Sequence, residues 1–186
     1  PDRGRMGGRR SGGMGAGKST VAEFLSSRGA EVVDVDALGR EIIEPGGIAV
    51  SSVVDRFGSS VSGAAGVIDR AALASLVFGD EEQLAALEEI SHPAINELLD
   101  LRVDGIKKPD SIIIFDMAVL FESQLGYATE HPYEIVAVVE APISDRLDRL
   151  ETQRGVSRED ALARIPSQAS HEERRSVAQF VIANGG

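Results

Sequence analysis

Residues 12 to 19, GGMGAGKS, follow the pattern Gly-x-x-x-x-Gly-Lys-Ser, in which each fixed position suits phosphate chemistry. The glycines let backbone N–H groups converge on phosphate oxygens, and Lys18 can reach the terminal phosphates of a nucleotide. The hydroxyl of Ser19 can bind the Mg²⁺ ion that accompanies such phosphates. A helical pattern begins directly after Lys18, which favours a phosphate-binding loop over the alternative of a flexible glycine-rich linker.

Two carboxylates, Asp34 and Asp36, follow in the stretch EVVDVD at residues 31–36, which begins as a short buried strand. One of these carboxylates is expected to face the phosphate loop at the end of the strand. A carboxylate beside an acceptor hydroxyl can act as the general base or orienting group of phosphoryl transfer. The other interpretation of Asp36 is that it caps the N-terminus of the following helix.

Helical and strand patterns alternate along the rest of the chain without an internal repeat. Apolar runs predict strands at residues 31–35, 111–116, 133–141 and 179–184. Helical spacing and capping residues predict helices at residues 18–28, 36–43, 48–57, 69–78, 81–90, 93–103, 143–154 and 157–165. Strands separated by helices imply a parallel α/β sheet that binds ligands at the carboxyl ends of its strands.

The segment before the phosphate loop is unusual for a central strand. Residues 4–13, GRMGGRRSGG, contain glycine and arginine and almost nothing apolar to bury. We therefore expect the first strand to be frayed or missing.

Composition limits the class of protein. The chain has 186 residues, 42% of them apolar and 26% charged, which predicts one folded domain. Its net charge of −11 repels polyanions, so neither nucleic acid nor an anionic membrane is an expected partner. The sequence contains no cysteine, and we find no apolar leader or membrane-spanning stretch. We expect a cytoplasmic protein that is a monomer or a weak oligomer.

The chain resembles the dephospho-CoA kinases, enzymes that phosphorylate the ribose 3'-hydroxyl of dephospho-CoA with ATP. The resemblance rests on an ordered set of segments at the family's spacing: GGMGAGKST, VVDVDALGREIIEPGG, DRAALASLVF, SHPAI, FDMAVLFES, RLETQRGVSREDALARIPSQAS and VIANGG. It implies ATP, Mg²⁺ and dephospho-CoA as ligands.

The resemblance also implies an α/β P-loop kinase-type fold of three layers, with a parallel five-stranded sheet in the order 2-3-1-4-5 flanked by helices. Within a single domain, residues of about 5–36 and 106–186 would form the core, and residues of about 37–105 a helical acceptor-binding lobe. A lid would lie at about residues 149–168.

Individual residues take roles from the resemblance. The catalytic residues would be Asp36 as the base, Lys18, and Asp116 near Mg²⁺ and the acceptor. The residues that bind ATP would be Gly13, Met14, Gly15, Ala16, Gly17, Lys18, Ser19, Thr20, Arg149, Arg154 and Asn184. The residues that bind the acceptor would be Arg40, His92, Leu120, Phe121 and Glu122.

Several of these side chains have a plainer interpretation. Arg40 can be a solvated arginine, and Asp116 a structural residue at a strand end. His92 can be a packing or capping residue rather than an acid. The chain also departs from the family, because Ala118 stands where proline is usual and Gln153 where many members have a lid arginine.

Two other functions stay open at this point. One is another small-molecule P-loop kinase, of the nucleoside monophosphate or shikimate type. The other is a nucleotide-binding module without turnover. A screen of acceptors separates the kinases from one another, and ATP binding without phosphoryl transfer would reveal the module.

Overall fold

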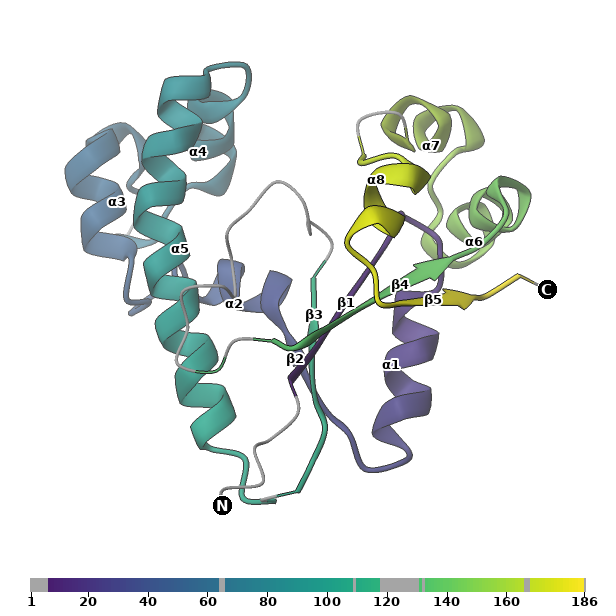
Figure 1. Ribbon diagram of the computed structural model, residues 1–186. Coiled ribbons are helices and arrows are strands. Elements are labelled where there is room, and N and C mark those ends of the chain that lie inside the picture. The colour runs from purple at the N-terminus through teal and green to yellow at the C-terminus, as the bar shows by residue number, and fades with distance from the viewer. Residues whose placement is uncertain are drawn as a thin grey trace. The chain divides into compact units, whose positions relative to one another are not determined.

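The structure is a computed structural model that describes residues 7–63, 66–108, 110–117, 131, 133–165 and 168–185. These residues divide into two compact units, one formed by residues up to 34 together with those from 105 onward, the other by residues 35–104 (Figure 1). The first unit contains the sheet, and the second consists mainly of helices.

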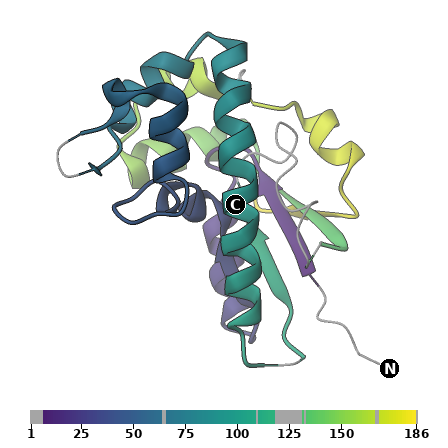
Figure 2. The same ribbon diagram turned by 90° about the vertical axis from the view of Figure 1, so that its left-hand side faces the viewer.

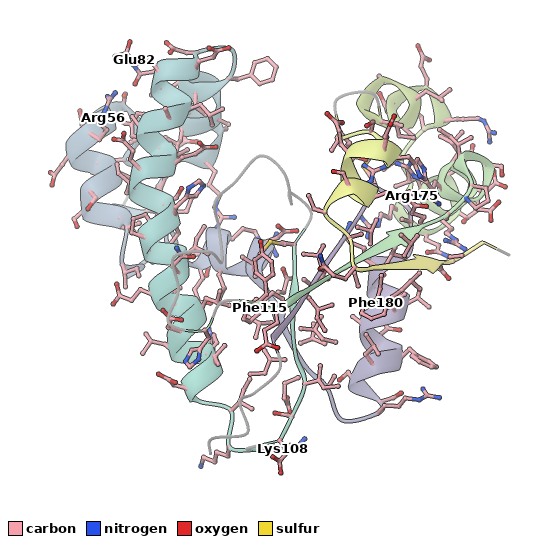
Figure 3. The ribbon with its side chains drawn as sticks, in the orientation of Figure 1. Arg56, Glu82, Lys108, Phe115, Arg175 and Phe180 are labelled. Atoms are coloured by element: carbon pink, nitrogen blue, oxygen red, sulfur yellow. The ribbon has the colours of Figure 1, made fainter. Side chains whose placement is uncertain are left out.

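The sheet has five parallel strands in the order β2-β3-β1-β4-β5. Their bounds are Gly7–Gly12 for β1, Glu31–Asp34 for β2, Ile113–Asp116 for β3, Ile135–Glu140 for β4 and Phe180–Ala183 for β5. The apolar runs of β3 and β4 are buried, including Phe115 (Figure 3) and Val138. The prediction of a parallel α/β sheet is therefore confirmed.

Strand β1 corrects one expectation, because it is neither frayed nor missing. It lies in the middle of the sheet, where Gly8 pairs with Ile114 of β3 on one side and with Ile135 of β4 on the other. A parallel ladder joins backbone groups, so a strand with neighbours on both sides can form from residues of low strand propensity. β1 thus delivers the chain to the phosphate loop at Gly12.

Four helices belong to the first unit: α1 (Lys18–Ser26), α6 (Ile143–Arg154), α7 (Arg158–Arg164) and α8 (His171–Ser176). Helices α6 and α7 bury Leu147, Leu150 and Ala161 in a small apolar cluster. Ser157 begins α7 as predicted, with its hydroxyl accepting the N–H of Asp160 at 3.1 Å.

Helix α8 was not predicted. The side chain of Ser170 accepts the N–H of Glu173, and the Glu173 carboxylate accepts the N–H of Ser170, which is a capping box. The pattern Ser-x-x-Glu at residues 170–173 was a signal that could have located this helix.

The second unit contains α2 (Val35–Glu41), α3 (Val50–Phe57), the 3₁₀ helix η1 (Ser59–Val61), α4 (Arg70–Val77) and α5 (Glu81–Asp104). Helices α3 and α4 lie beside the N-terminal half of the long α5 in both views (Figure 1, Figure 2). Asp69 caps α4 as predicted, and its carboxylate accepts the N–H groups of Ala71 and Ala72, each at 3.0 Å.

Helix α5 replaces the two separate helices expected at residues 81–90 and 93–103. Pro93 lies inside it and removes one backbone hydrogen bond. Ile95, Leu99 and Val103 are buried at a spacing of one helical turn beyond the proline. Packing of this face evidently outweighs the lost hydrogen bond. None of the helices in the described part of the chain combines the length and apolar composition needed to cross a membrane.

Candidate nucleotide-binding site

The predicted phosphate loop is formed. It runs from the end of β1 at Gly12 to the start of α1 at Lys18, and the N–H of Ala16 donates to the carbonyl of Gly13 at 3.0 Å. The ammonium group of Lys18 donates to the carbonyl of Gly12 at 2.8 Å, which folds its side chain back over the loop. Helix α1 has no acidic residue in its first turn and no side-chain cap, so its N-terminus suits an anion.

Two glycines of the loop are required by their backbone and by their surroundings. Gly15 and Gly17 have φ angles of 77° and 86°, in the left-handed region that side chains disfavour. A Cβ atom on Gly15 would lie 2.6 Å from the carbonyl oxygen of Arg146, and one on Gly17 would overlap the amide of Asn184. The loop is therefore packed directly against α6 and the segment after β5.

The backbone of Met14 is held on both sides. Its N–H donates to Oε1 of Gln168 at 3.0 Å, and its carbonyl accepts Nε of Arg146 at 2.9 Å. Arg146 also donates from Nη2 to Oε1 of Gln168 at 3.3 Å. The Met14 side chain packs against the apolar cluster of α6 and α7.

Arg149 and Asn184, two predicted ATP-binding residues, meet at the carbonyl of Ala16. That carbonyl accepts Nδ2 of Asn184 at 3.0 Å and Nη1 of Arg149 at 3.4 Å. Arg149 also donates from Nη2 to the carbonyl of Asn184 at 2.8 Å. The N–H of Asn184 donates to the carbonyl of Glu140 at 2.7 Å, which ties this corner to the end of β4.

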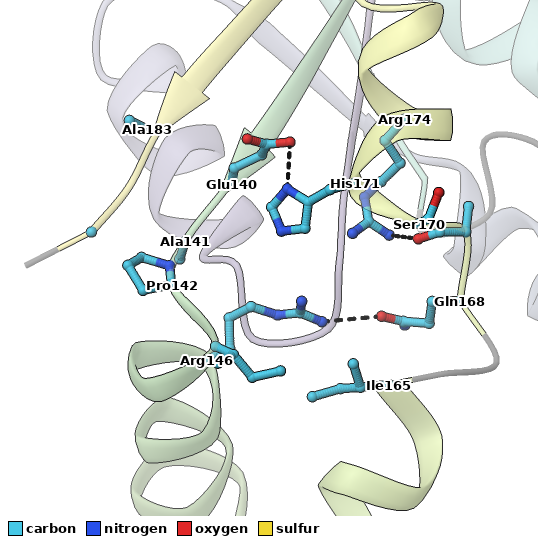
Figure 4. A pocket seen from close by; sticks show the side chains of 13 residues that line it. Glu140, Ala141, Pro142, Arg146, Ile165, Gln168, Ser170, His171, Arg174 and Ala183 are labelled. Carbon is cyan, nitrogen blue, oxygen red and sulfur yellow. Dashed lines mark hydrogen bonds and ion pairs between the residues drawn. The ribbon is translucent and has the colours of Figure 1, made fainter.

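A pocket of about 770 Å³ adjoins this corner (Figure 4). It is lined by the ends of β4 and β5, the first turn of α6, and by Ile165, residues 168–171 and Arg174. Two of its arginines, Arg146 and Arg174, are only 4% and 6% exposed. Burial lowers the pKa of both guanidinium groups, and the charge of Arg174 lowers the pKa of Arg146 further. Arginine nevertheless stays protonated near neutral pH, so these two side chains bring positive charge to the pocket wall.

The pocket's carboxylate, Glu140, is already bound by the guanidinium of Arg175 and the ring of His171. Arg175 donates to it from Nη2 at 2.6 Å and from Nε at 3.0 Å, and Nδ1 of His171 lies 2.9 Å from its Oε1. The hydrogen bonds from Arg175 are the main cause that lowers the pKa of Glu140, although burial opposes them. Glu140 therefore orders α8 against the end of β4.

Arg154, Ser19 and Thr20 complete the predicted ATP side and are all exposed. Arg154 is in the last turn of α6, and Ser19 and Thr20 are in the first turn of α1. In the part of the chain that the structure describes, no hydrogen bond joins Arg154 to the phosphate loop. The structure thus brings Arg149 to the loop and leaves Arg154 in solvent.

The carboxylates are arranged differently from the prediction. Asp116 ends β3 and is half-buried, and it pairs in register with Asp34 at the end of β2. Asp36 neither ends the strand nor precedes the helix as an N-cap residue, because α2 begins at Val35. Strands β2 and β3 end together at the paired residues Asp34 and Asp116. Asp36 is instead an exposed residue in the first turn of α2.

The predicted acceptor residues that the structure describes are in the second unit. Arg40 is exposed in the last turn of α2, and His92 is half-buried in α5. Gly39 of α2 faces Ile95 of α5, because a Cβ on Gly39 would lie 3.6 Å from the Ile95 side chain. Leu120, Phe121 and Glu122 lie outside the described residues.

A bound Mg²⁺ would find suitable oxygen atoms on this chain. No cluster of three or more His, Cys, Asp or Glu side chains that could hold a metal occurs among the described residues. Mg²⁺ in kinases usually keeps several water molecules and takes one or two protein oxygens besides the phosphates. The exposed hydroxyl of Ser19 and the half-buried carboxylate of Asp116 are donors of this chemistry.

Sequence reasoning missed Arg146 and Gln168. Arg146 had a signal, because it precedes Leu150 by one helical turn and so falls on the buried face of α6, where a charge needs partners. Gln168 had none, since a glutamine between two helices can equally face solvent.

Comparison with known proteins agrees with this geometry. A sequence model of the dephospho-CoA kinase family matches residues 10–186. Dephospho-CoA kinase from Thermobifida fusca is 40% identical over 175 residues, which are 94% of this chain and 85% of that protein. Dephospho-CoA kinase from Leifsonia xyli is 39% identical over 177 residues, covering 94% of this chain and 87% of that protein.

Solved structures show the same fold. A crystal structure of a Thermus thermophilus protein has 34% sequence identity and a TM-score of 0.82, and the match covers 99% of this chain and 91% of that one. A dephospho-CoA kinase from Campylobacter jejuni has 24% identity and a TM-score of 0.67, and the match covers 97% and 88% of the two chains. From its phosphate loop to its last strand, this chain belongs to the dephospho-CoA kinase family.

Proposed function

We propose that this protein transfers the terminal phosphoryl group of ATP to the ribose 3'-hydroxyl of dephospho-CoA, which gives coenzyme A in the last step of its biosynthesis. The observation that carries this proposal is the family match over residues 10–186, together with a fully formed phosphate loop. The fold is the α/β fold of P-loop kinases.

The ATP side of the proposed site is in the first unit. We assign the β- and γ-phosphates to the loop of residues 13–20, through the backbone N–H groups that are not bound within the protein, and to Lys18. Arg149 and Asn184 would border the nucleotide beside Ala16, and Arg154 would approach the phosphates from the lid at about residues 149–168. Mg²⁺, held by Ser19 and the phosphates, would neutralise the charge that develops during transfer.

The acceptor side is assigned to Asp36, Arg40 and His92 of the second unit, to Asp116, and to Leu120, Phe121 and Glu122. The ribose 3'-oxygen would attack the γ-phosphorus, the bond from that phosphorus to the β,γ-bridging oxygen would break, and ADP would leave. Asp36 would take the proton of the 3'-hydroxyl, the role that the family resemblance implies for this carboxylate. We propose that residues of about 37–105 form this acceptor-binding lobe of a single kinase domain.

A coupled assay of ADP release tests the proposal with ATP and Mg²⁺ and four candidate acceptors: dephospho-CoA, AMP, shikimate and gluconate. We expect turnover with dephospho-CoA alone. Comparable rates with AMP or shikimate would contradict the assignment and favour another small-molecule kinase. ATP binding with no turnover on any acceptor would favour a non-catalytic module.

A further inference from the structure

Met14 is the one residue of the phosphate loop whose two backbone polar groups are both bound by side chains from elsewhere in the described chain. Gln168, 154 positions later, takes its N–H at 3.0 Å, and Arg146, 132 positions later, donates to its carbonyl at 2.9 Å. The two side chains also bond each other at 3.3 Å. We name this pair, Arg146 and Gln168, the Met14 clamp.

Burial of the Arg146 guanidinium costs folding free energy, which distinguishes the clamp from incidental packing. Arg146 is 4% exposed, and within the described residues it makes no ion pair with a carboxylate. Burial and the nearby charge of Arg174 both lower the pKa of its guanidinium. A buried cation without a carboxylate partner opposes folding. Its hydrogen bonds to the Met14 carbonyl and to Gln168 must therefore fix the backbone of Met14, which a Leu or Met side chain at position 146 could not do.

The loop is shaped to receive the clamp. A Cβ on Gly13 would lie 2.6 Å from Nη2 and 2.8 Å from Cζ of Arg146. A Cβ on Gly15 would lie 2.6 Å from the Arg146 carbonyl oxygen. The glycines on both sides of Met14 thus leave room for Arg146, in addition to any need for close approach by a phosphate.

We infer that Arg146 and Gln168 are positioning residues that hold the phosphate loop in its nucleotide-binding shape by fixing the peptide groups of Met14. The inference rests on the proposed function only in taking ATP as the ligand of the loop. The N–H of Met14 donates to Gln168 and that of Ala16 donates to the Gly13 carbonyl, so phosphate would be bound by other N–H groups of the loop. Gln168 lies between α7 and α8, and the clamp therefore connects the position of its side chain to nucleotide affinity.

The test is calorimetric titration of the full chain with ATP and Mg²⁺ in the absence of acceptor. The variants are Arg146→Met, Gln168→Leu, the double variant, and Arg146→Lys, which keeps the charge but loses the two-nitrogen fork. Arg28→Met is the matched arginine control, because Arg28 is exposed outside the phosphate loop and the lid, and its guanidinium lies over the Phe24 ring at 3.6 Å. Leu99→Ala controls for general destabilisation, since Leu99 is fully buried in the second unit.

We expect each clamp variant, Arg146→Lys included, to weaken ATP binding by roughly 5- to 50-fold, the equivalent of one or two lost hydrogen bonds. The double variant should lose less than the product of the two single effects, because the two side chains act on one residue. Arg28→Met and Leu99→Ala should bind ATP like wild type at a temperature where all variants are folded.

Three results would overturn the inference. The first is wild-type affinity in Arg146→Met and Gln168→Leu. The second is wild-type affinity in Arg146→Lys with loss in Arg146→Met, which would show that charge alone acts. The third is an equal loss in Leu99→Ala, which would show a general effect of stability. Each of these leaves the proposed function untouched, whereas a wild-type chain that does not bind ATP would overturn both.

Discussion

The phosphate loop and helix α2 differ in how their functional side chains are held. Around the loop, Arg146, Arg149, Gln168 and Asn184 all bond backbone groups of residues 14–16, over sequence separations of more than 130 residues. Helix α2 has seven residues, and it buries Val35 and Leu38 while Asp36 and Arg40 stay exposed.

This difference predicts two kinds of mutational effect. The loop is shaped by groups that touch one another, so substitutions there should change ATP affinity. Exposed side chains on a short helix contribute little to the folded state, so substitutions of Asp36 or Arg40 should change turnover while stability and ATP affinity stay close to wild type.

The largest expected effect is in α2. We expect Asp36→Asn to lower kcat by roughly 10²- to 10⁴-fold, because the amide keeps the size of the side chain but cannot accept the proton of the acceptor hydroxyl. Steady-state kinetics with dephospho-CoA would measure kcat, and calorimetry would show unchanged ATP affinity. Asp34→Asn is the control and should do less. Wild-type turnover in a folded Asp36→Asn would remove Asp36 from the mechanism and direct attention to Asp116.

The second effect is in the loop and compares two glycines of similar backbone. Gly15 and Gly155 have φ angles of 77° and 62°, but only Gly15 is crowded, since a Cβ on Gly155 meets no atom within 4 Å. We expect Gly15→Ala to raise the KM for ATP by roughly 10- to 100-fold. The new Cβ would be strained by the positive φ angle and would also clash with the carbonyl oxygen of Arg146. Gly155→Ala should lose some stability with the KM for ATP unchanged. Equal KM values for the two variants would contradict the close packing of the loop.

Acid stability probes the carboxylate that orders α8. The folded state lowers the pKa of Glu140, so the group stabilises the protein above its ordinary pKa of 4.5, and this contribution is lost as pH falls below that value. Thermal unfolding along a pH series from neutral downward should therefore show a steeper acid loss in wild type than in Glu140→Gln. Identical slopes would show that Glu140 titrates alike in the folded and unfolded chain.

The smallest effect is expected at the cap of α4. Asp69→Ala removes the acceptor of two N–H groups and should cost about 1 kcal/mol in the free energy of unfolding, measured by urea denaturation. Asp69→Asn should cost much less, since asparagine also caps well. We expect the KM for ATP to stay unchanged in both variants. A change in that KM would contradict the expectation that only substitutions around the loop alter ATP affinity.

The sequence predicted those features that depend on residues close together in the chain. The phosphate loop follows from glycine spacing and the helix after it, and the caps at Asp69 and Ser157 follow from side chains that accept nearby N–H groups. Family resemblance predicted Arg149 and Asn184, which do lie against Ala16.

What failed depends on contacts that are distant in sequence. Strand β1 forms because β3 and β4 flank it, and α5 runs through Pro93 because its face is buried beyond the proline. The strand and helix propensities of single residues contain no information about these tertiary neighbours. The hydrogen-bond partners of Arg146 are likewise set by tertiary structure. The sequence showed only that an arginine on a buried helix face needs such partners.

Transfer of phosphate to the 3'-hydroxyl of dephospho-CoA can be read from the structure of the product. Phosphorus NMR of a reaction with ATP, Mg²⁺ and dephospho-CoA should show a new phosphate monoester whose phosphorus couples to the ribose H3' proton. We expect this signal to grow in step with ADP and to be absent without enzyme. A product phosphorylated at another position, or ADP formed while dephospho-CoA stays unchanged, would contradict the proposed transfer.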